Sequence, residues 1–93
     1  MTKVILKGYV IACDKDIPSI EAELPKHIQL TIQEMGCIVF QVSQDTKNKN
    51  RFNVYEEFTD KKAFDAHQAR VKASRWGEVS ANFEKHYHVM EGV

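Results

Sequence analysis

The sequence has no net charge, no long apolar run and only two cysteines, and each shortage argues against a class of protein. Thirteen basic residues balance thirteen acidic ones, so the chain lacks the positive field that supplies most non-specific affinity for nucleic acid. Its longest apolar runs, such as residues 9–13, are far shorter than the ~20 residues that cross a bilayer. We therefore expect no nucleic-acid partner and no membrane partner.

The N-terminal residues and the cysteines favour a cytoplasmic location. Residues 1–7 lack the long apolar stretch and the small-residue cleavage site of a secretory signal. In the absence of such a signal, Cys13 and Cys37 are expected to be reduced thiols packed as small hydrophobic groups. We expect the cytoplasm as the compartment and no structural disulfide.

The composition is that of one folded domain without a recognisable cofactor motif. The chain has 93 residues, of which 43% are hydrophobic and 28% charged, and this leaves room for one modest core over residues 1–93. No segment repeats and no linker appears. A glycine-rich phosphate loop, C-x-x-C, G-x-S-x-G and paired zinc motifs are all missing from the sequence. We expect no nucleotide, flavin or thiolate-bound haem, and no cofactor.

Hydrophobic periodicity predicts a first strand and a first helix. Residues 3–12 alternate as a strand does. After a polar segment, Asp16 or Ser19 can cap a helix that ends before Gly36, a good left-handed terminator. Because Pro25 removes a backbone donor, we expect a kink or a restart of the helix there. The expected buried stripe is Ile20, Leu24, Ile28, Thr31 and Met35.

A hairpin, a second helix and a last strand complete the chain. Alternation over residues 37–44 and 52–58 predicts two strands joined by a short polar loop, and residues 83–90 form the last strand. Asp60 can cap the second helix. Its stripe is Phe64, His67, Gln68 and Val71, with a less regular continuation through Trp76 and Val79. The order βαββαβ predicts an α+β sandwich of ferredoxin-like topology, with both helices on one face of an antiparallel sheet.

Two titratable residues at core-facing positions form the candidate catalytic pair. His67 shares a stripe with Phe64 and Val71, and an imidazole is the natural proton carrier at neutral pH. The alternative, which spacing alone favours, is a core-edge histidine satisfied by a backbone carbonyl. Glu56 lies in an apolar row of its strand, where a carboxylate is costly unless it is paired or functional. Its alternative is a partly exposed glutamate paired with a lysine or arginine.

The last strand and the end of the second helix hold weaker candidates. His86 and His88 form an H-x-H pair that shares a face with Glu84, as two metal ligands and a third would. Exposed or interface histidines account for most such pairs, so we expect no metal. Trp76 is expected to close the core or to act as a lid, because large aromatic side chains usually do so.

The middle of the chain carries a series of motifs with characteristic order and spacing. The motifs are Glu34-Met35-Gly36-Cys37, then Asp45, then Tyr55-Glu56-Glu57-Phe58, and then Ala63 with His67 four residues later. This series resembles the antibiotic biosynthesis monooxygenase domains, which typically show E-P-G-C, an aspartate, Y-E-x-W and A-x-x-x-H. Here Met35 replaces the proline and Phe58 the common tryptophan. The T-P-H-x-x-x-F continuation of the family is replaced by residues 70–76.

The resemblance implies a dimeric α+β barrel with a small-molecule pocket in each subunit, between the sheet and the helices. His67 matches the pocket histidine of the family, Glu56 the strand glutamate, and Phe58 the tryptophan position. The residues expected to contact the substrate are Phe58, Val54, Phe40 and Trp76.

The resemblance also implies a choice of activities. The family includes cofactor-independent monooxygenases of quinols and polyketide phenols, haem-degrading enzymes and an isomerase of a phosphorylated quorum-sensing sugar. The haem-degrading branch uses tryptophan where this chain has His67, so we do not expect haem degradation. Among the other activities we expect first a monooxygenase that deprotonates a quinol or phenol for reaction with dioxygen. The isomerase and a non-catalytic small-molecule binder remain the alternatives. Basic residues at the pocket would favour the phosphorylated substrate, and an apolar lining the quinol.

The sheet face away from the helices predicts a two-fold homodimer, because an apolar patch on a monomer usually marks an interface. The residues expected there are Ile5, Tyr9, Ile11, Val39 and Tyr55. We expect sedimentation at micromolar concentration to show a species of twice the chain mass. A stable monomer under these conditions would contradict both the interface and the barrel architecture.

Overall fold

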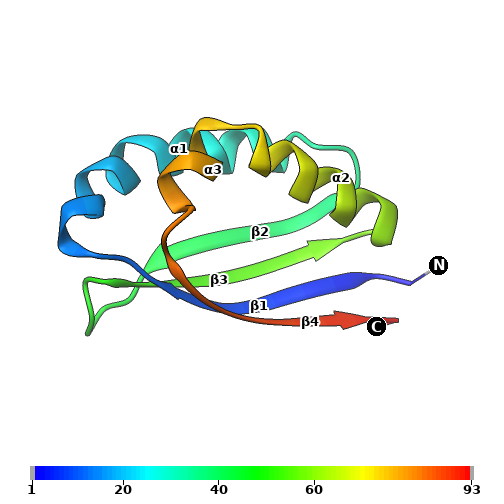
Figure 1. Cartoon of the computed structure of the whole chain (residues 1–93). Coiled ribbons are helices and arrows are strands. Elements are labelled where there is room, and N and C mark those ends of the chain that lie inside the picture. The colour runs from blue at the N-terminus through cyan, green and yellow to red at the C-terminus, as the bar shows by residue number, and fades with distance from the viewer. Residues whose placement is uncertain (1, 93) are drawn as a thin grey trace.

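Two layers, an antiparallel sheet and the helices that cover one of its faces, make up the molecule (Figure 1). A computed structural model describes residues 2–92, so Met1 and Val93 of the expected domain lie outside the described part. The elements are β1 (Val4–Ile11), the 3₁₀ turn η1 (Asp14–Asp16), α1 (Ile17–Ile32), β2 (Cys37–Gln44), β3 (Arg51–Phe58), α2 (Lys61–Lys72), α3 (Arg75–Ser80) and β4 (Glu84–Glu91). The strand order β2-β3-β1-β4 confirms the ferredoxin-like α+β fold.

The register of the central strands assigns the two faces of the sheet as the sequence predicted. Glu56 of β3 stands opposite Leu6 of β1 and Phe40 of β2, and opposed residues in an antiparallel pair share a face. Phe52, Val54, Glu56 and Phe58 are all buried under the helices, whereas Tyr55 and Glu57 between them lie on the other face. Glu56 is therefore placed in the core layer by its strand alone.

The apolar core fills both ends of the layer between sheet and helices. At one end Val10, Ile20, Phe52 and Phe83 form a cluster, and burying each such side chain contributes roughly 1.5–3 kcal/mol. At the other end Phe58 is fully buried together with Val4 and Leu6. The space between these two ends is where the polar side chains of the layer lie.

The first helix differs from its prediction at three points. It runs through Pro25 without a restart. The carbonyl that Pro25 leaves free, four residues earlier, is that of exposed Glu21, where water can satisfy it. Asp16 occupies the N-cap position without a side-chain bond. The helix ends at Ile32, so Met35 falls in the following turn and is 95% exposed rather than buried.

Gly36 closes that turn in a conformation that other residues rarely adopt. Its φ is +89°, a region that glycine enters without steric cost. A side chain there would also meet Thr59 Oγ1 at 2.9 Å. The turn packs Gly36 against Thr59 and Ala63, at the start of α2. Glu34, two residues before Gly36, faces the same helix.

The second helical region is two helices rather than one irregular one. Asp60 caps α2 as expected, its carboxylate accepting a hydrogen bond from the Ala63 amide at 2.8 Å. A new helix, α3, then starts at a second cap, Ser74, which accepts from the Gly77 amide at 3.2 Å. The break between α2 and α3 turns Trp76 toward the space between the layers, where its ring meets Phe83 edge-on at 6.0 Å.

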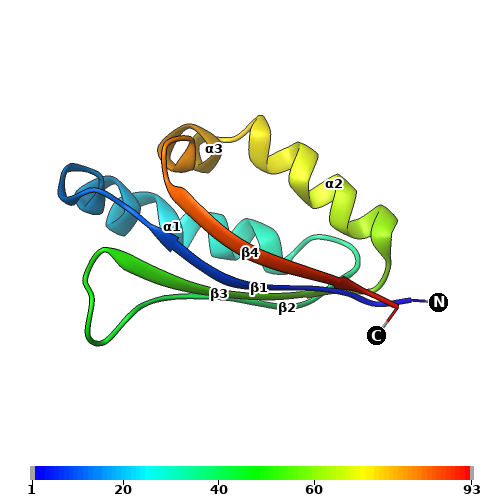
Figure 2. The same cartoon turned by 60° about the horizontal axis from the view of Figure 1, so that its bottom comes forward.

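The second face of the sheet carries no helix, and both termini lie at the same end of the molecule (Figures 1 and 2). The residues expected on this face, including Tyr9 and Tyr55, are half-buried there. Polar groups are interleaved with them, since Arg51 lies over the Tyr9 ring at 3.8 Å and the Tyr55 hydroxyl donates to Glu57 at 2.5 Å. Within residues 2–92 no helix is both long and apolar enough to cross a membrane.

Candidate functional site

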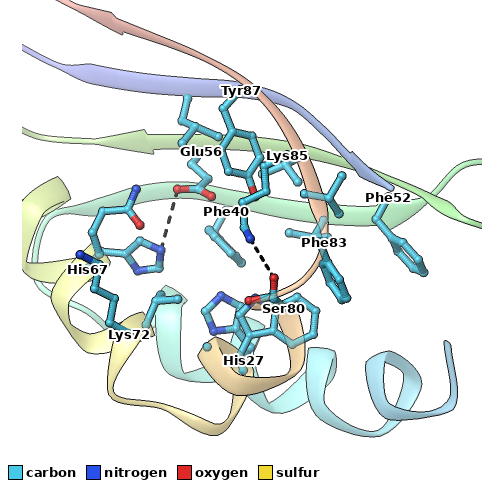
Figure 3. A pocket seen from close by; sticks show the side chains of 18 of the residues that line it. His27, Phe40, Phe52, Glu56, His67, Lys72, Ser80, Phe83, Lys85 and Tyr87 are labelled. Carbon is cyan, nitrogen blue, oxygen red and sulfur yellow. Dashed lines mark hydrogen bonds and ion pairs between the residues drawn. The ribbon is translucent and has the colours of Figure 1, made fainter. Parts of the chain in front are cut away.

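A cavity of about 640 Å³ separates the two halves of the core (Figure 3). This volume falls within the roughly 300–1,000 Å³ of small-molecule sites. All four strands and all three α-helices contribute to its walls, which are mostly apolar with a few polar groups. Its polar lining consists of His27 from α1, Glu56 from β3, His67, Gln68 and Lys72 from α2, Ser80 from α3, and Lys85 and Tyr87 from β4.

His67 faces this cavity, as the helical stripe predicted, and it is only 3% exposed. Its Nδ1 lies 2.7 Å from Glu34 Oε1, so the alternative partner, a backbone carbonyl, is wrong. The Glu34 carboxylate accepts a hydrogen bond from the Nδ1–H group. A neutral His67 therefore carries its free lone pair on Nε2, the nitrogen that faces Glu56. Burial lowers the pKa of His67 although Glu34 acts to raise it. The imidazole is therefore a free base at neutral pH.

Glu34 is itself held by the second helix. Its other oxygen, Oε2, pairs with Arg70 Nε, one helical turn after His67. Arg70 also donates from Nη2 to Thr31 Oγ1 at 2.9 Å, and the Thr31 hydroxyl donates to the His27 carbonyl at 2.8 Å. These bonds join α1, the Gly36 turn and α2 beneath the cavity, and they fix the imidazole plane of His67.

Glu56 is 7% exposed and has no lysine or arginine partner, so the alternative of a salt-bridged surface glutamate is wrong. Burial, and secondarily the charge of Glu34, raises the pKa of Glu56 to about 8. Its Oε1 lies 3.8 Å from His67 Nε2, which is too long for a hydrogen bond. At neutral pH this contact joins a carboxylic acid to a neutral imidazole, with room for a third group near both (Figure 3).

A second histidine, His27, faces the same cavity and was missed in the sequence. It is 4% exposed, and burial lowers its pKa to about 4. Its ring stacks on Trp76 at 5.2 Å and meets the edge of Phe40 at the same distance. The signal was present, because position 27 lies seven residues after Ile20 and four before Thr31, on the buried stripe.

The aromatic and aliphatic walls match the expected set with one exception. Phe40, Val54 and Trp76 line the cavity. Phe58 does not line it, which corrects the expectation that it contacts the substrate. Its ring is fully buried behind His67, at 5.0 Å between centroids, and it supports the imidazole from outside the cavity.

The edge strand β4 supplies polar groups that the sequence did not single out. Tyr87 is 43% exposed, yet its ring lines the cavity, and burial of its inner part together with Glu56 raises the pKa of its hydroxyl to about 12. The hydroxyl therefore keeps its proton at neutral pH and can donate a hydrogen bond. Lys85 donates from Nζ to the Ser80 carbonyl at 2.8 Å, across the gap between β4 and α3 (Figure 3).

The sequence relationship agrees with this geometry. Residues 16–79, from the start of α1 to α3, match the family described as antibiotic biosynthesis monooxygenase. The chain belongs to this family. A search of curated proteins finds no match.

Solved structures share the monooxygenase-family fold at low identity. A Nitrosomonas europaea protein described as an antibiotic biosynthesis monooxygenase superimposes with a TM-score of 0.73 at 18% identity, over 97% of this chain and 86% of the other. A Pseudomonas aeruginosa protein gives 0.74 at 18% identity over 98% and 92%. A Bacteroides thetaiotaomicron protein gives 0.72 at 13% identity over 97% and 95%. These likenesses establish the fold of the family domain.

The H-x-H pair lies away from this site. Register places His86 opposite Tyr9 and His88 opposite Lys7, on the face without helices. His86 stacks on Tyr9 at 4.6 Å and pairs with Glu84 at 2.7 Å. Throughout residues 2–92, no three His, Cys, Asp or Glu side chains are grouped closely enough to hold a metal ion. The cysteines are free thiols in this structure.

The two shifted pKa values predict opposite effects on stability. Between pH 4.5 and about 8, native Glu56 keeps its proton after the unfolded carboxyl has lost one, so the native state binds more protons and stability falls as pH rises. Glu56→Gln should remove this fall, which is worth roughly 5 kcal/mol across the window. His27 acts in reverse. Between pH 6.5 and about 4 the unfolded imidazole binds the proton first, and stability falls as pH drops.

Urea unfolding between pH 4 and 9, followed by Trp76 fluorescence, measures both effects. Glu57→Gln is the matched control, since this neighbour points to the other face and its pKa is lowered by Tyr55 and Lys3. The control should leave the slope between pH 5 and 8 as in the wild type. Equal slopes for Glu56→Gln and the wild type would mean that Glu56 ionises as an ordinary surface carboxyl.

Proposed function

We propose that this domain is a cofactor-independent monooxygenase acting on a quinol or phenol. The observation that carries the proposal is the buried series Glu34, His67 and Glu56 at an aromatic cavity. Glu34 is the carboxylate, His67 the neutral base and Glu56 the protonated acid, and they lie next to one another in this order. Family membership supports the reaction class.

The first step is transfer of a hydroxyl proton from the substrate to His67 Nε2. The resulting imidazolium is stabilised by the Glu34 carboxylate at 2.7 Å from Nδ1. The substrate anion gains a donor in the carboxylic acid of Glu56, which the cavity keeps protonated at neutral pH. Neither group needs to move far, because Nε2 and Oε1 are 3.8 Å apart and both border the cavity.

The second step is attack of the electron-rich anion on dioxygen, which is the oxidant. A carbon of the substrate forms the bond to one oxygen atom. Cleavage of the O–O bond then leaves this oxygen in the product, and the second oxygen leaves as water with two hydrogens lost by the substrate. During this cleavage His67 gives up the proton that it took from the substrate, and this proton becomes one of the two hydrogens of the water. The protein supplies position, a base and a dry cavity for the reaction.

The second candidate is an isomerase of a phosphorylated sugar, which the cavity's two lysines favour. Lys72 and Lys85 line the cavity from α2 and β4, and two cations in one cavity lining suit a phosphate group. The remaining lining is largely apolar, and Lys85 already donates to the Ser80 carbonyl. We therefore rank this candidate below the oxygenase. Conversion of phosphorylated ketoses without oxygen uptake would reverse the ranking, and binding without turnover would indicate a non-catalytic binder.

A homodimer and a cytoplasmic location are part of this proposal. The helix-free face of the sheet supports the dimer, since Tyr9, Tyr55 and their apolar neighbours are only half-buried there and no helix of residues 2–92 covers this face. The interleaved polar groups, such as Arg51 and Glu57, give such an interface directional contacts as well as apolar area.

Purified protein is expected to consume oxygen with quinols or anthrones, and His67 is expected to carry the proton transfer. His67→Ala should lower turnover about 10²–10⁴-fold, the usual effect of removing a positioned base. Lys62→Ala, an exposed change on the same helix, is the control. Oxygen uptake, product formation and melting temperature are measured together. A His67→Ala variant that loses stability but keeps full turnover would assign the histidine to the structure rather than to the reaction.

The pH dependence of kcat/KM should be bell-shaped. The rate rises as His67 loses its proton, at a pKa lowered by burial below the ordinary 6.5. It falls above about pH 8, where Glu56 ionises and repels the substrate anion. Glu56→Gln should remove the alkaline fall while leaving the acid limb in place. An unchanged alkaline limb in this variant would assign that limb to another group.

A further inference from the structure

Two buried polar atoms of residues 2–92 have no hydrogen-bond partner, His27 Nδ1 and Glu56 Oε1. Leaving a buried donor or acceptor unpaired is costly, and native structures contain few such atoms. Those that persist call for a physical reason, such as a bound molecule. Both residues line the same cavity, so a molecule in that cavity lies next to both side chains.

The two atoms belong to opposite walls. Glu56 rises from β3 on the sheet side, whereas His27 comes from α1 on the helix side, with the cavity between them (Figure 3). His67 stands between the two, its ring 5.9 Å from that of His27 and its Nε2 3.8 Å from Glu56 Oε1. Glu56 therefore lies on one side of the base and His27 on the other.

The His27 imidazole is held in place without a side-chain hydrogen bond. Its ring is parallel to Trp76 within 14° and meets Phe40 at 82°, and its own backbone carbonyl accepts the bond from Thr31. Packing and backbone thus fix the ring, and Nδ1 has no hydrogen-bond partner among residues 2–92. A neutral imidazole offers one donor and one acceptor, which is what a hydroxyl group pairs with in either direction.

We propose that His27 is a second polar contact for the substrate, binding a hydroxyl or carbonyl group at the end opposite to the one that Glu56 and His67 handle. The ligand chemistry is a flat aromatic molecule with polar groups at both ends of its ring system. This inference deepens the proposed function and rests on it for the aromatic nature of the ligand. It assigns His27 to recognition, with no part in proton transfer.

A cycle of two ligands and two proteins tests the proposal. The probes are 2-naphthol, with one hydroxyl, and 2,6-dihydroxynaphthalene, with a second hydroxyl at the far end. Calorimetric titration should show the diol binding wild type about tenfold more tightly than the mono-ol, the value of one well-placed hydrogen bond. In His27→Phe, which keeps an aromatic ring against Trp76, the two probes should bind equally.

Two further variants separate recognition from folding. His27→Asn places a polar atom near the former Nδ1 and should restore part of the preference for the diol. His27→Leu, smaller and apolar, should behave as His27→Phe does, and it serves if the phenylalanine does not fit. His27→Phe is expected to melt no lower than wild type, because an unpaired polar group has been removed.

Three results would overturn the proposal. The first is an equal preference for the diol in wild type and in both apolar variants. The second is failure of wild type to bind either probe. The third is a preference that disappears in all variants alike, His27→Asn included, which would show that the shape of the imidazole and not its nitrogen matters. A wild type that prefers the diol but consumes no oxygen with quinols or anthrones would reject the oxygenase proposal. It would leave His27 as a binding residue.

Discussion

The ion pair of Glu34 with Arg70, shared with His67, is the contact on which the site depends. It connects the turn after α1 to the last turn of α2 and is partly shielded from water. A buried charge needs a partner of this kind, because its desolvation cost otherwise exceeds what packing supplies. The pair fixes which nitrogen of His67 carries the proton. It also places one negative charge near Glu56, where this charge adds to the burial that raises the pKa of Glu56.

This arrangement divides the site into a charged layer and a neutral one. The charges of Glu34 and Arg70 lie behind His67, whereas four polar groups of the cavity lining, His27, His67, Glu56 and Tyr87, are uncharged at neutral pH. The charged groups of the lining are the two lysines, Lys72 and Lys85. An apolar substrate enters such a cavity without displacing strongly held counter-charges. In the proposed reaction, positive charge would develop on His67 next to the Glu34 carboxylate, which is how preorganised electrostatics favours a transition state.

The cavity is lined partly by an edge strand and not by interior elements alone. β4 lies at the sheet edge, where Lys85 and Tyr87 reach the cavity while their strand stays largely exposed. Gly8 permits the close approach of β1 to β4, since a side chain there would overlap the His86 carbonyl oxygen. A substitution on β4 can therefore change the lining of the cavity at little cost to the core, and one fold can in this way host different functions.

The sequence by itself determined the order of the elements, the faces of β1 and β3, the Asp60 cap and the direction of His67 and Glu56. These follow from periods of 2 and 3.6 residues, which are local properties of the chain. Tertiary structure alone decided that Glu34 holds His67, that Glu56 lacks a cation, that Phe58 lies behind the histidine, and that His27 shares the cavity. Each of these joins residues from different elements, and spacing along the chain carries no information on which distant groups meet. Helix endings belong to the same class, since the turn at Gly36 exposed Met35 against its periodicity.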